Sequence, residues 1–273
     1  MLLQRAPRGH GAPLTRGRAW ALALRLLLLA SVALLAWFGL VRAAADTAAA
    51  PTPVSFDDLL EASLANSPEP NLLAVMEAVS FAAEQAVPPN ERSTLFDGMG
   101  QIYQVPQEVA FYAAAARMPG VRTVCEVGFN AGHSAAVFLL SNPQTSYIGF
   151  DLMSLRWSAA SLSFMQRAFP GRVTIVRGYS TDTLPQHSAP LCDILSIDGE
   201  HAGETPYLDI VNGKKASRAG GLVLMDDWSS TSPDVKAAWK KAKESGLLEE
   251  IKCVDEGIFV KQYHKAWCLG RYL

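Results

Sequence analysis

Apolar residues from about residue 105 onward alternate between two periodicities, one typical of strands and one typical of helices. Short apolar or β-branched runs predict strands at 121–127, 147–150, 173–176, 193–197 and 221–225. Helical spacing predicts helices at 106–118, 134–140, 156–168, 203–217 and 233–244. Two last runs, 250–254 and 258–262, flank Asp255-Glu256-Gly257 and predict a closing hairpin. The pattern predicts an α/β fold with a doubly wound, mostly parallel seven-stranded sheet and a C-terminal antiparallel hairpin.

A helical segment precedes this alternating region. Residues 56–64 and 72–79 carry apolar side chains at helical spacing, and Pro88-Pro89 ends the segment. We therefore predict three regions: a leader at 1–45, a linker with a helical preface at 46–104, and the α/β domain at 105–273.

The leader combines arginine residues with a long apolar run. Residues 26–41 are uncharged and apolar, and the run reaches 23 residues if it is counted from Ala19 through Arg25. A helix of that length spans roughly 35 Å, enough to cross a bilayer. Four arginines precede the span and one follows it, which predicts a single-pass anchor with a cytoplasmic N-terminus and a lumenal or extracytoplasmic domain. A cleaved signal peptide and an organelle transit peptide are the alternatives.

The charge distribution excludes one class of partner. The formal charge of −2 hides six arginines in residues 1–45, which contain no acid. The remainder carries 18 basic and 26 acidic residues, a formal charge of −8. An acidic body does not offer the basic face that nucleic-acid binding requires. We therefore expect no nucleic-acid partner.

Polar residues follow the ends of the predicted strands, where doubly wound sheets bind their ligands. The first group runs from Glu126 to Ser134, and it contains Gly128 for a tight turn and Gly132 for close approach of a ligand. The spacing is neither that of a dinucleotide fingerprint nor that of a phosphate-binding loop. Asp151 ends the next strand, where an acid can accept both hydroxyls of a ribose. Small polar groups at 177–185 could line an adenine pocket.

A second group consists of acids at two neighbouring strand ends. Asp198 lies in Asp198-Gly-Glu-His201, and Asp226-Asp227 follows the next strand. Three carboxylates at adjacent strand ends can converge on a hard divalent cation, and Mg²⁺ fits better than Zn²⁺ because no cysteine or second histidine has ligand spacing. His201 is a candidate general base near neutral pH.

Together these motifs resemble the class I S-adenosylmethionine-dependent methyltransferases over residues 100–262. They are most similar to the metal-dependent small-molecule O-methyltransferases of the catechol and caffeoyl-CoA type and of the macrolide-sugar and aminocoumarin-sugar type. The resemblance implies a Rossmann-like methyltransferase domain at 105–273. It implies Asp198, Asp226 and Asp227 as Mg²⁺ ligands and His201 or Glu200 as the base. Contacts to S-adenosylmethionine are implied for Glu126, Gly128, Asn130, Gly132, Ser134, Asp151, Ser180 and Asp198.

By this resemblance the chain methylates a hydroxyl of a small molecule or sugar with the help of Mg²⁺. A methyltransferase-like protein that binds a ligand or partner without turnover is the alternative. The four cysteines carry a separate expectation. Cys125 and Cys192 lie in or beside predicted core strands and are expected to be buried thiols. Cys253 and Cys268 can form a disulfide if the α/β domain lies outside the cytoplasm.

Overall fold

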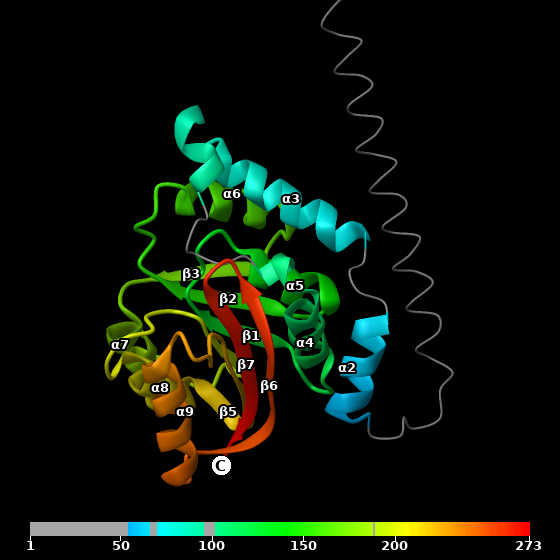
Figure 1. Ribbon diagram of the computed structural model, residues 1–273. Helices are drawn as coiled ribbons and strands as arrows, with labels where there is room; N and C mark the ends of the chain where they lie inside the picture. The colour runs from blue at the N-terminus through cyan, green and yellow to red at the C-terminus, as the bar shows by residue number, and fades with distance from the viewer. Residues whose placement is uncertain (1–53, 66–69, 96–101, 188) are drawn as a thin grey trace, which may run out of the picture. The chain divides into compact units, whose positions relative to one another are not determined.

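A seven-stranded sheet forms the centre of the computed structural model, which describes residues 54–65, 70–95, 102–187 and 189–273 (Figure 1). Its order is β3-β2-β1-β4-β5-β7-β6. The first five strands are parallel, and β7 is antiparallel to both β5 and β6. The strands are β1 Thr123–Val127, β2 Ser146–Asp151, β3 Val173–Arg177, β4 Cys192–Ile197, β5 Ser217–Met225, β6 Leu248–Val260 and β7 Tyr263–Tyr272. This architecture confirms the predicted mostly parallel sheet with antiparallel strands at its C-terminal edge.

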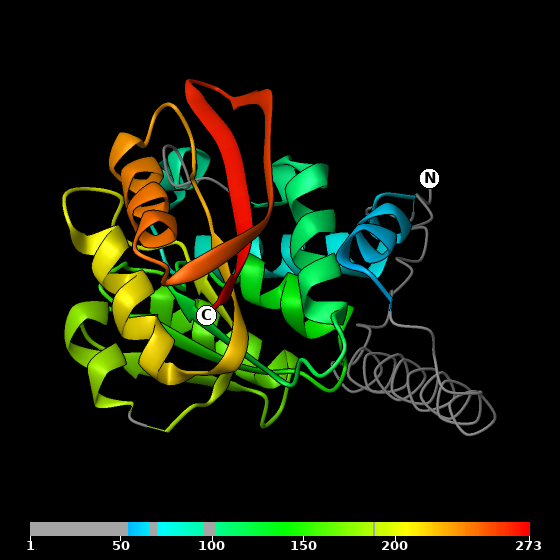
Figure 2. The ribbon, with the colours of Figure 1, turned by 90° about the horizontal axis from the view of Figure 1, so that it is seen from below.

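Helices cover both faces of the sheet, and their buried side chains form two hydrophobic cores (Figure 2). One core holds Phe111 of α4, Phe138 of α5 and Met165 of α6. The other holds Ile210 of α8 and Trp239 of α9. The helices are α2 Phe56–Ala65, α3 Pro70–Glu84, α4 Pro106–Arg117, α5 His133–Ser141, α6 Ser158–Ala168, α7 Ser180–Thr183, α8 Thr205–Ala216 and α9 Pro233–Glu244. Short 3-10 helices lie at Pro89–Thr94, Ile102–Gln104 and Leu184–Gln186.

The predicted helical preface packs against the first core. Helix α2 contacts α4, and α3 contacts α5 and α6. Phe56 of α2 meets Phe111 of α4 edge-to-face, with the ring centroids 4.9 Å apart. The preface therefore belongs to the same compact unit as the sheet. This unit runs from Val54 to Leu273.

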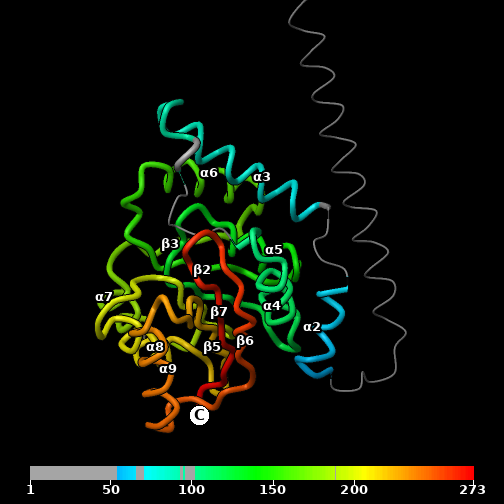
Figure 3. Tube along the Cα trace, in the orientation of Figure 1, coloured from blue at the N-terminus to red at the C-terminus, as the bar shows by residue number. Residues whose placement is uncertain are grey.

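The trace of the backbone shows how the site arises (Figure 3). Strands β1, β2, β4 and β5 run in the same direction, so their carboxyl ends lie at one edge of the sheet. The loops after these strands carry the polar motifs that the sequence singles out. The fold thus brings residues far apart in the chain to one edge, as is usual for doubly wound sheets.

The C-terminal hairpin differs from its prediction. Residues 255–257 do not form the turn; they lie inside β6, where the pairing with β7 shifts register between Val254 and Ile258. The turn falls at 261–262, and Lys261 has a left-handed φ of 55°. Strand β7, from 263 to 272, is absent from the sequence prediction. An Asp-Glu-Gly sequence suits a bulge as well as a turn, because both need unpaired, exposed backbone.

The cysteines also correct a prediction. Cys125 and Cys192 are buried as expected, but they form a disulfide and are not free thiols, with their Cα atoms 5.5 Å apart. Cys253 and Cys268 form a second disulfide between the paired strands β6 and β7. Both pairings join neighbouring strands of the sheet.

The predicted membrane-spanning leader lies outside the described residues. Within the described part of the chain, none of the helices combines the length and the apolar character needed to cross a bilayer.

Candidate active site

The loop after β1 lies in close contact with the end of β4. Gly128 has a φ of 93° and Gly132 has a φ of 89°, conformations that favour glycine. A Cβ on Gly128 would overlap the backbone carbonyl oxygen of Asp198, and its distance to the carbonyl carbon would be 2.8 Å. The loop from β1 therefore touches the end of β4 through backbone alone, which makes Gly128 a steric requirement of the site.

Glu126 lies beneath this loop and is fully buried. Its carboxylate accepts hydrogen bonds from the hydroxyls of Tyr147 at 2.6 Å, Ser134 at 2.8 Å and Ser196 at 3.1 Å. Burial raises the pKa of Glu126 to about 8, against the lowering effect of the hydroxyl donors. The side chain thus ties β1, β2, β4 and α5 together. A direct cofactor contact by Glu126 stays a prediction.

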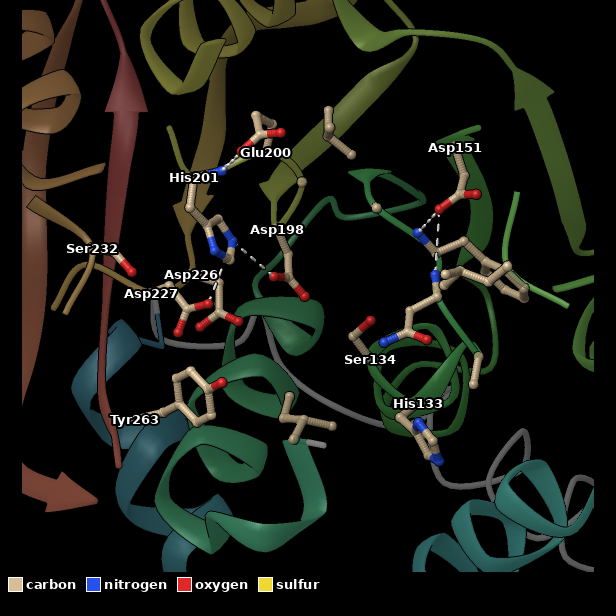
Figure 4. Close-up of a pocket in the computed structure, with 18 of the residues that line it drawn as sticks. His133, Ser134, Asp151, Asp198, Glu200, His201, Asp226, Asp227, Ser232 and Tyr263 are labelled. Atoms are coloured by element: carbon tan, nitrogen blue, oxygen red, sulfur yellow. Dashed lines mark hydrogen bonds and ion pairs between the residues drawn. The ribbon is translucent and has the colours of Figure 1, made fainter. Parts of the chain in front are cut away.

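Asp151 at the end of β2 anchors the same loop. One carboxylate oxygen accepts hydrogen bonds from the backbone N–H of Phe129 at 2.7 Å and of Asn130 at 3.4 Å. The other oxygen accepts from the N–H of Met153 at 2.5 Å. The Asn130 side chain is fixed in turn by Trp157, whose indole N–H donates to its Oδ1 at 2.9 Å. Asp151 is therefore held at the rim of the loop, facing the cavity (Figure 4).

Asp198, His201 and Asp227 converge at the neighbouring strand ends. The His201 Nε2 lies 3.7 Å from Asp198 Oδ1 and 3.4 Å from Asp227 Oδ2. Asp227 adopts a left-handed φ of 48°. Burial lowers the pKa of His201, but the carboxylates of Asp198 and Asp227 outweigh burial and raise it. Glu200 differs, because its Oε1 accepts hydrogen bonds from the N–H of His201 and of Ala202 and so caps this turn.

Asp226 does not join that triad but points toward a buried lysine. The Lys265 Nζ on β7 lies 3.7 Å from Asp226 Oδ2, 2.9 Å from Asp227 Oδ1 and 4.0 Å from Glu108 Oε2 on α4. Burial raises the pKa of Glu108 to about 7, and burial together with Glu108 raises the pKa of Asp226. Burial opposes the charge of Lys265, but Asp226 and the neighbouring acids outweigh it and raise the pKa of its ammonium group. An ammonium ion thus sits among these acids.

A single cavity of about 1380 Å³ connects the two groups of residues. Gly128, Asn130, Ser134, Asp151 and Ser180 line one part of it. Asp198, Glu200, His201, Asp226 and Asp227 line the other. Figure 4 shows Asp151 on one side, the acids and His201 on the other, and Ser134 between them. Most of the residues expected from the sequence therefore meet around one space, but Glu126 and Gly132 do not line it.

Two charged residues of this site, Glu108 and Lys265, are absent from the candidates predicted from the sequence. Each carried a signal. Glu108 is four residues before Tyr112, so it lies on the apolar face of its helix, where a charge is out of place. Lys265 directly precedes the apolar run Ala266-Trp267-Cys268-Leu269. A charged side chain next to such a run is buried with an oppositely charged partner when the strand is buried.

Residues 125–228 match the model of a family described as a methyltransferase domain. Over this segment the chain is therefore similar to a methyltransferase domain. No curated protein matches the chain. The matched segment contains the glycine loop after β1, Asp151 and all three predicted metal-ligating acids, and it ends before Lys265.

Solved structures share the methyltransferase fold at low sequence identity. Cofactor-bound Rv0187 from MTB has a TM-score of 0.56 and 20% identity over 82% of this chain and 99% of its own. The O-methyltransferase TomG from Streptomyces achromogenes, solved with SAM, has a TM-score of 0.56 and 14% identity over 71% of this chain and 89% of its own. An O-methyltransferase from Bacillus cereus, solved with SAH, has a TM-score of 0.54 and 14% identity over 80% of this chain and 100% of its own.

The donor atoms at these strand ends fit a divalent cation. One ligand atom from each of Asp198, His201 and Asp227 lies within 4.8 Å of the others. Carboxylate oxygens suit Mg²⁺ and Mn²⁺. Asp226 is absent from this triad, because its carboxylate faces Lys265 and Glu108. The three-aspartate set stays a prediction, and the geometry favours Asp198 and Asp227.

Proposed function

We propose that this methyltransferase transfers a methyl group from S-adenosylmethionine to a hydroxyl of a small molecule, assisted by a divalent cation. The observation that carries the proposal is the single cavity, which places a ribose-type acid, Asp151, and a cation-type cluster, Asp198 with Asp227, around one space. A methyl donor seated against the glycine loop would then face an acceptor seated against the acids. The SAM- and SAH-bound neighbours of the same fold support this choice of donor.

The chain's own residues supply orientation and proton transfer. Asp151 and the backbone of the glycine loop hold the ribose and methionine parts of the donor. Asp198 and Asp227 hold the cation, which lowers the pKa of a bound hydroxyl when it is present. His201, which faces both carboxylates, takes the proton of the acceptor hydroxyl. Because methyl transfer needs little beyond alignment and a deprotonated oxygen, these roles account for catalysis.

The methyltransferase assay is methyl transfer from isotopically labelled S-adenosylmethionine to a panel of catechols and sugars, run with the full chain and Mg²⁺. We expect turnover that Asp198→Asn abolishes and that Glu61→Gln, a change of an exposed acid on α2 that does not line the cavity, leaves unchanged. Binding of S-adenosylhomocysteine should survive in both variants. Binding without turnover on the whole panel would favour a non-catalytic methyltransferase-like protein.

We further propose that the domain works on the lumenal or extracytoplasmic side of a membrane. Two disulfides that use all four cysteines support this, since disulfides persist in oxidising compartments. The Arg-rich, apolar leader supports a retained anchor or a cleaved signal. N-terminal sequencing of the protein taken from its native membrane fraction distinguishes the two: an intact Met1 means an anchor, and a start near Ala45 means cleavage.

A further inference from the structure

The acidic cluster of the methyltransferase is divided into an inner and an outer half by one carboxylate. Asp227 directs Oδ1 to the Lys265 ammonium at 2.9 Å and Oδ2 to the His201 Nε2 at 3.4 Å. The inner half contains Lys265, Asp226 and Glu108, all at most 8% exposed. The outer half contains Asp198 and His201, which are more than a third exposed. The two halves therefore differ in access to water and share only Asp227.

The inner half holds a cation that belongs to the chain itself, the ammonium group of Lys265. Asp226 Oδ1 and Glu108 Oε2 are buried and have no hydrogen-bond partner among the described residues. Buried acids without partners are costly, and the Lys265 ammonium group, 3.7 Å from the other oxygen of Asp226 and 4.0 Å from Glu108 Oε2, offsets part of that cost. Strand β7 supplies it: β7 pairs with β5 as far as Met225 opposite Cys268, and its earlier residues reach past the end of β5 to the acids.

The charges of the cluster favour binding of a second cation, but only in its outer half. The carboxyl groups of Glu108, Asp226 and Asp227 surround one lysine, while Asp198 lies on the outer side. The carboxylates of Asp198 and Asp227 attract a divalent cation to the outer half, while the ammonium group repels it from the inner half. Lys265 and a metal ion therefore cannot share Asp226.

We propose that Lys265 is a built-in cation of this active site, which holds Asp226 and one oxygen of Asp227 and confines a divalent cation to the outer half, between Asp198 and the other oxygen of Asp227. The inference deepens the proposed function, because it rests on the cation-assisted reaction and says which acids bind that cation. Lys265 is a positioning residue: it fixes Asp227 and removes Asp226 from the ligand set. The wild-type site then binds one cation with fewer ligands than the acids of the cluster could provide.

The consequence is that loss of Lys265 should strengthen metal binding. Lys265→Met removes the repulsive charge and frees Asp226 to become a ligand. We expect Mn²⁺ to bind this variant about tenfold or more tightly than it binds the wild type. Lys261→Met is the matched control, because Lys261 lines the same cavity, is exposed and loses the same charge. It should change the affinity by less than about twofold.

The test is a Mn²⁺ titration of the full chain, followed by the electron paramagnetic resonance signal of free Mn²⁺, without methyl donor or acceptor. Asp226→Asn is added in both backgrounds. In the wild type it should weaken binding by about threefold or less, and in Lys265→Met by about tenfold or more, because only there is Asp226 a ligand.

Equal or weaker Mn²⁺ binding by Lys265→Met, or no binding by either protein, would overturn the proposal. If Lys265→Met does not fold, judged by circular dichroism, the double variant Glu108→Gln/Lys265→Met carries the test, since it keeps the net charge and still frees Asp226. It too should bind more tightly than the wild type, and failure to do so overturns the proposal. Because no methyl donor is present, this result is independent of whether the protein binds S-adenosylmethionine.

Discussion

Gly128→Ala tests the contact between the glycine loop and the end of β4. Gly128 has a φ of 93°, so any L-residue there is strained by about 1–2 kcal/mol. The new Cβ would also overlap the Asp198 carbonyl, which belongs to rigid backbone, and overpacking of this kind adds about 1–3 kcal/mol. Gly120 is the matched control, because its φ is 89° and a Cβ there would have nothing within 4 Å.

We expect Gly120→Ala to lower the free energy of unfolding by about 1–2 kcal/mol and Gly128→Ala by about 2–5 kcal/mol. The difference between the two variants isolates the close approach from the backbone strain. Urea denaturation measures both free energies, and calorimetry with S-adenosylhomocysteine measures the donor site. Gly128→Ala should also weaken that binding at least tenfold, about 1.4 kcal/mol, because the displaced loop carries it. Equal destabilisation by the two variants, with unchanged binding, would refute this reading of the loop.

Three further predictions concern the base, the buried acid and the cysteines. His201→Gln should lower kcat by about a hundredfold or more while Mn²⁺ affinity changes by less than about threefold; loss of metal affinity instead would make His201 a ligand. The pKa of Glu126 is raised to about 8, so the folded protein binds this proton more tightly than the unfolded chain, and stability falls as the pH rises from about 4.5 to about 8. Glu126→Gln should make the fall of stability with pH less steep in urea denaturation, and identical slopes would contradict the raised pKa. Alkylation under denaturing, non-reducing conditions should label none of the four cysteines, and a mass increase would show a reduced pair.

The parallel part of the fold could be predicted because its sequence signals are local. Each buried strand is a short apolar run followed by a polar residue, and each helix has its own periodicity. The same pattern placed Asp151, Asp198 and Asp227 at strand ends, and parallel strands bring such ends together. The candidate site followed from this regularity.

The inner half of the site could not be predicted in the same way. Lys265 meets Asp226 and Asp227 because β7 inserts between β5 and β6, and nothing in the local sequence specifies that order. The disulfide between Cys125 and Cys192 has the same origin, since β4 lies beside β1 and not beside β3. The predicted hairpin placed residue 265 beyond the last strand. Both errors arise from strand order, which depends on packing of the whole sheet.

The most direct measurement is a calorimetric titration of S-adenosylhomocysteine into the full chain, with Asp151→Ala and Glu61→Gln as paired variants. Asp151 lines the cavity, whereas Glu61 is an exposed acid on α2 that does not line it. We predict micromolar binding to the wild type and to Glu61→Gln, and at least a tenfold loss, about 1.4 kcal/mol, in Asp151→Ala. Absence of binding to a folded wild-type protein, or full binding to Asp151→Ala, would contradict a methyl-donor site at this loop.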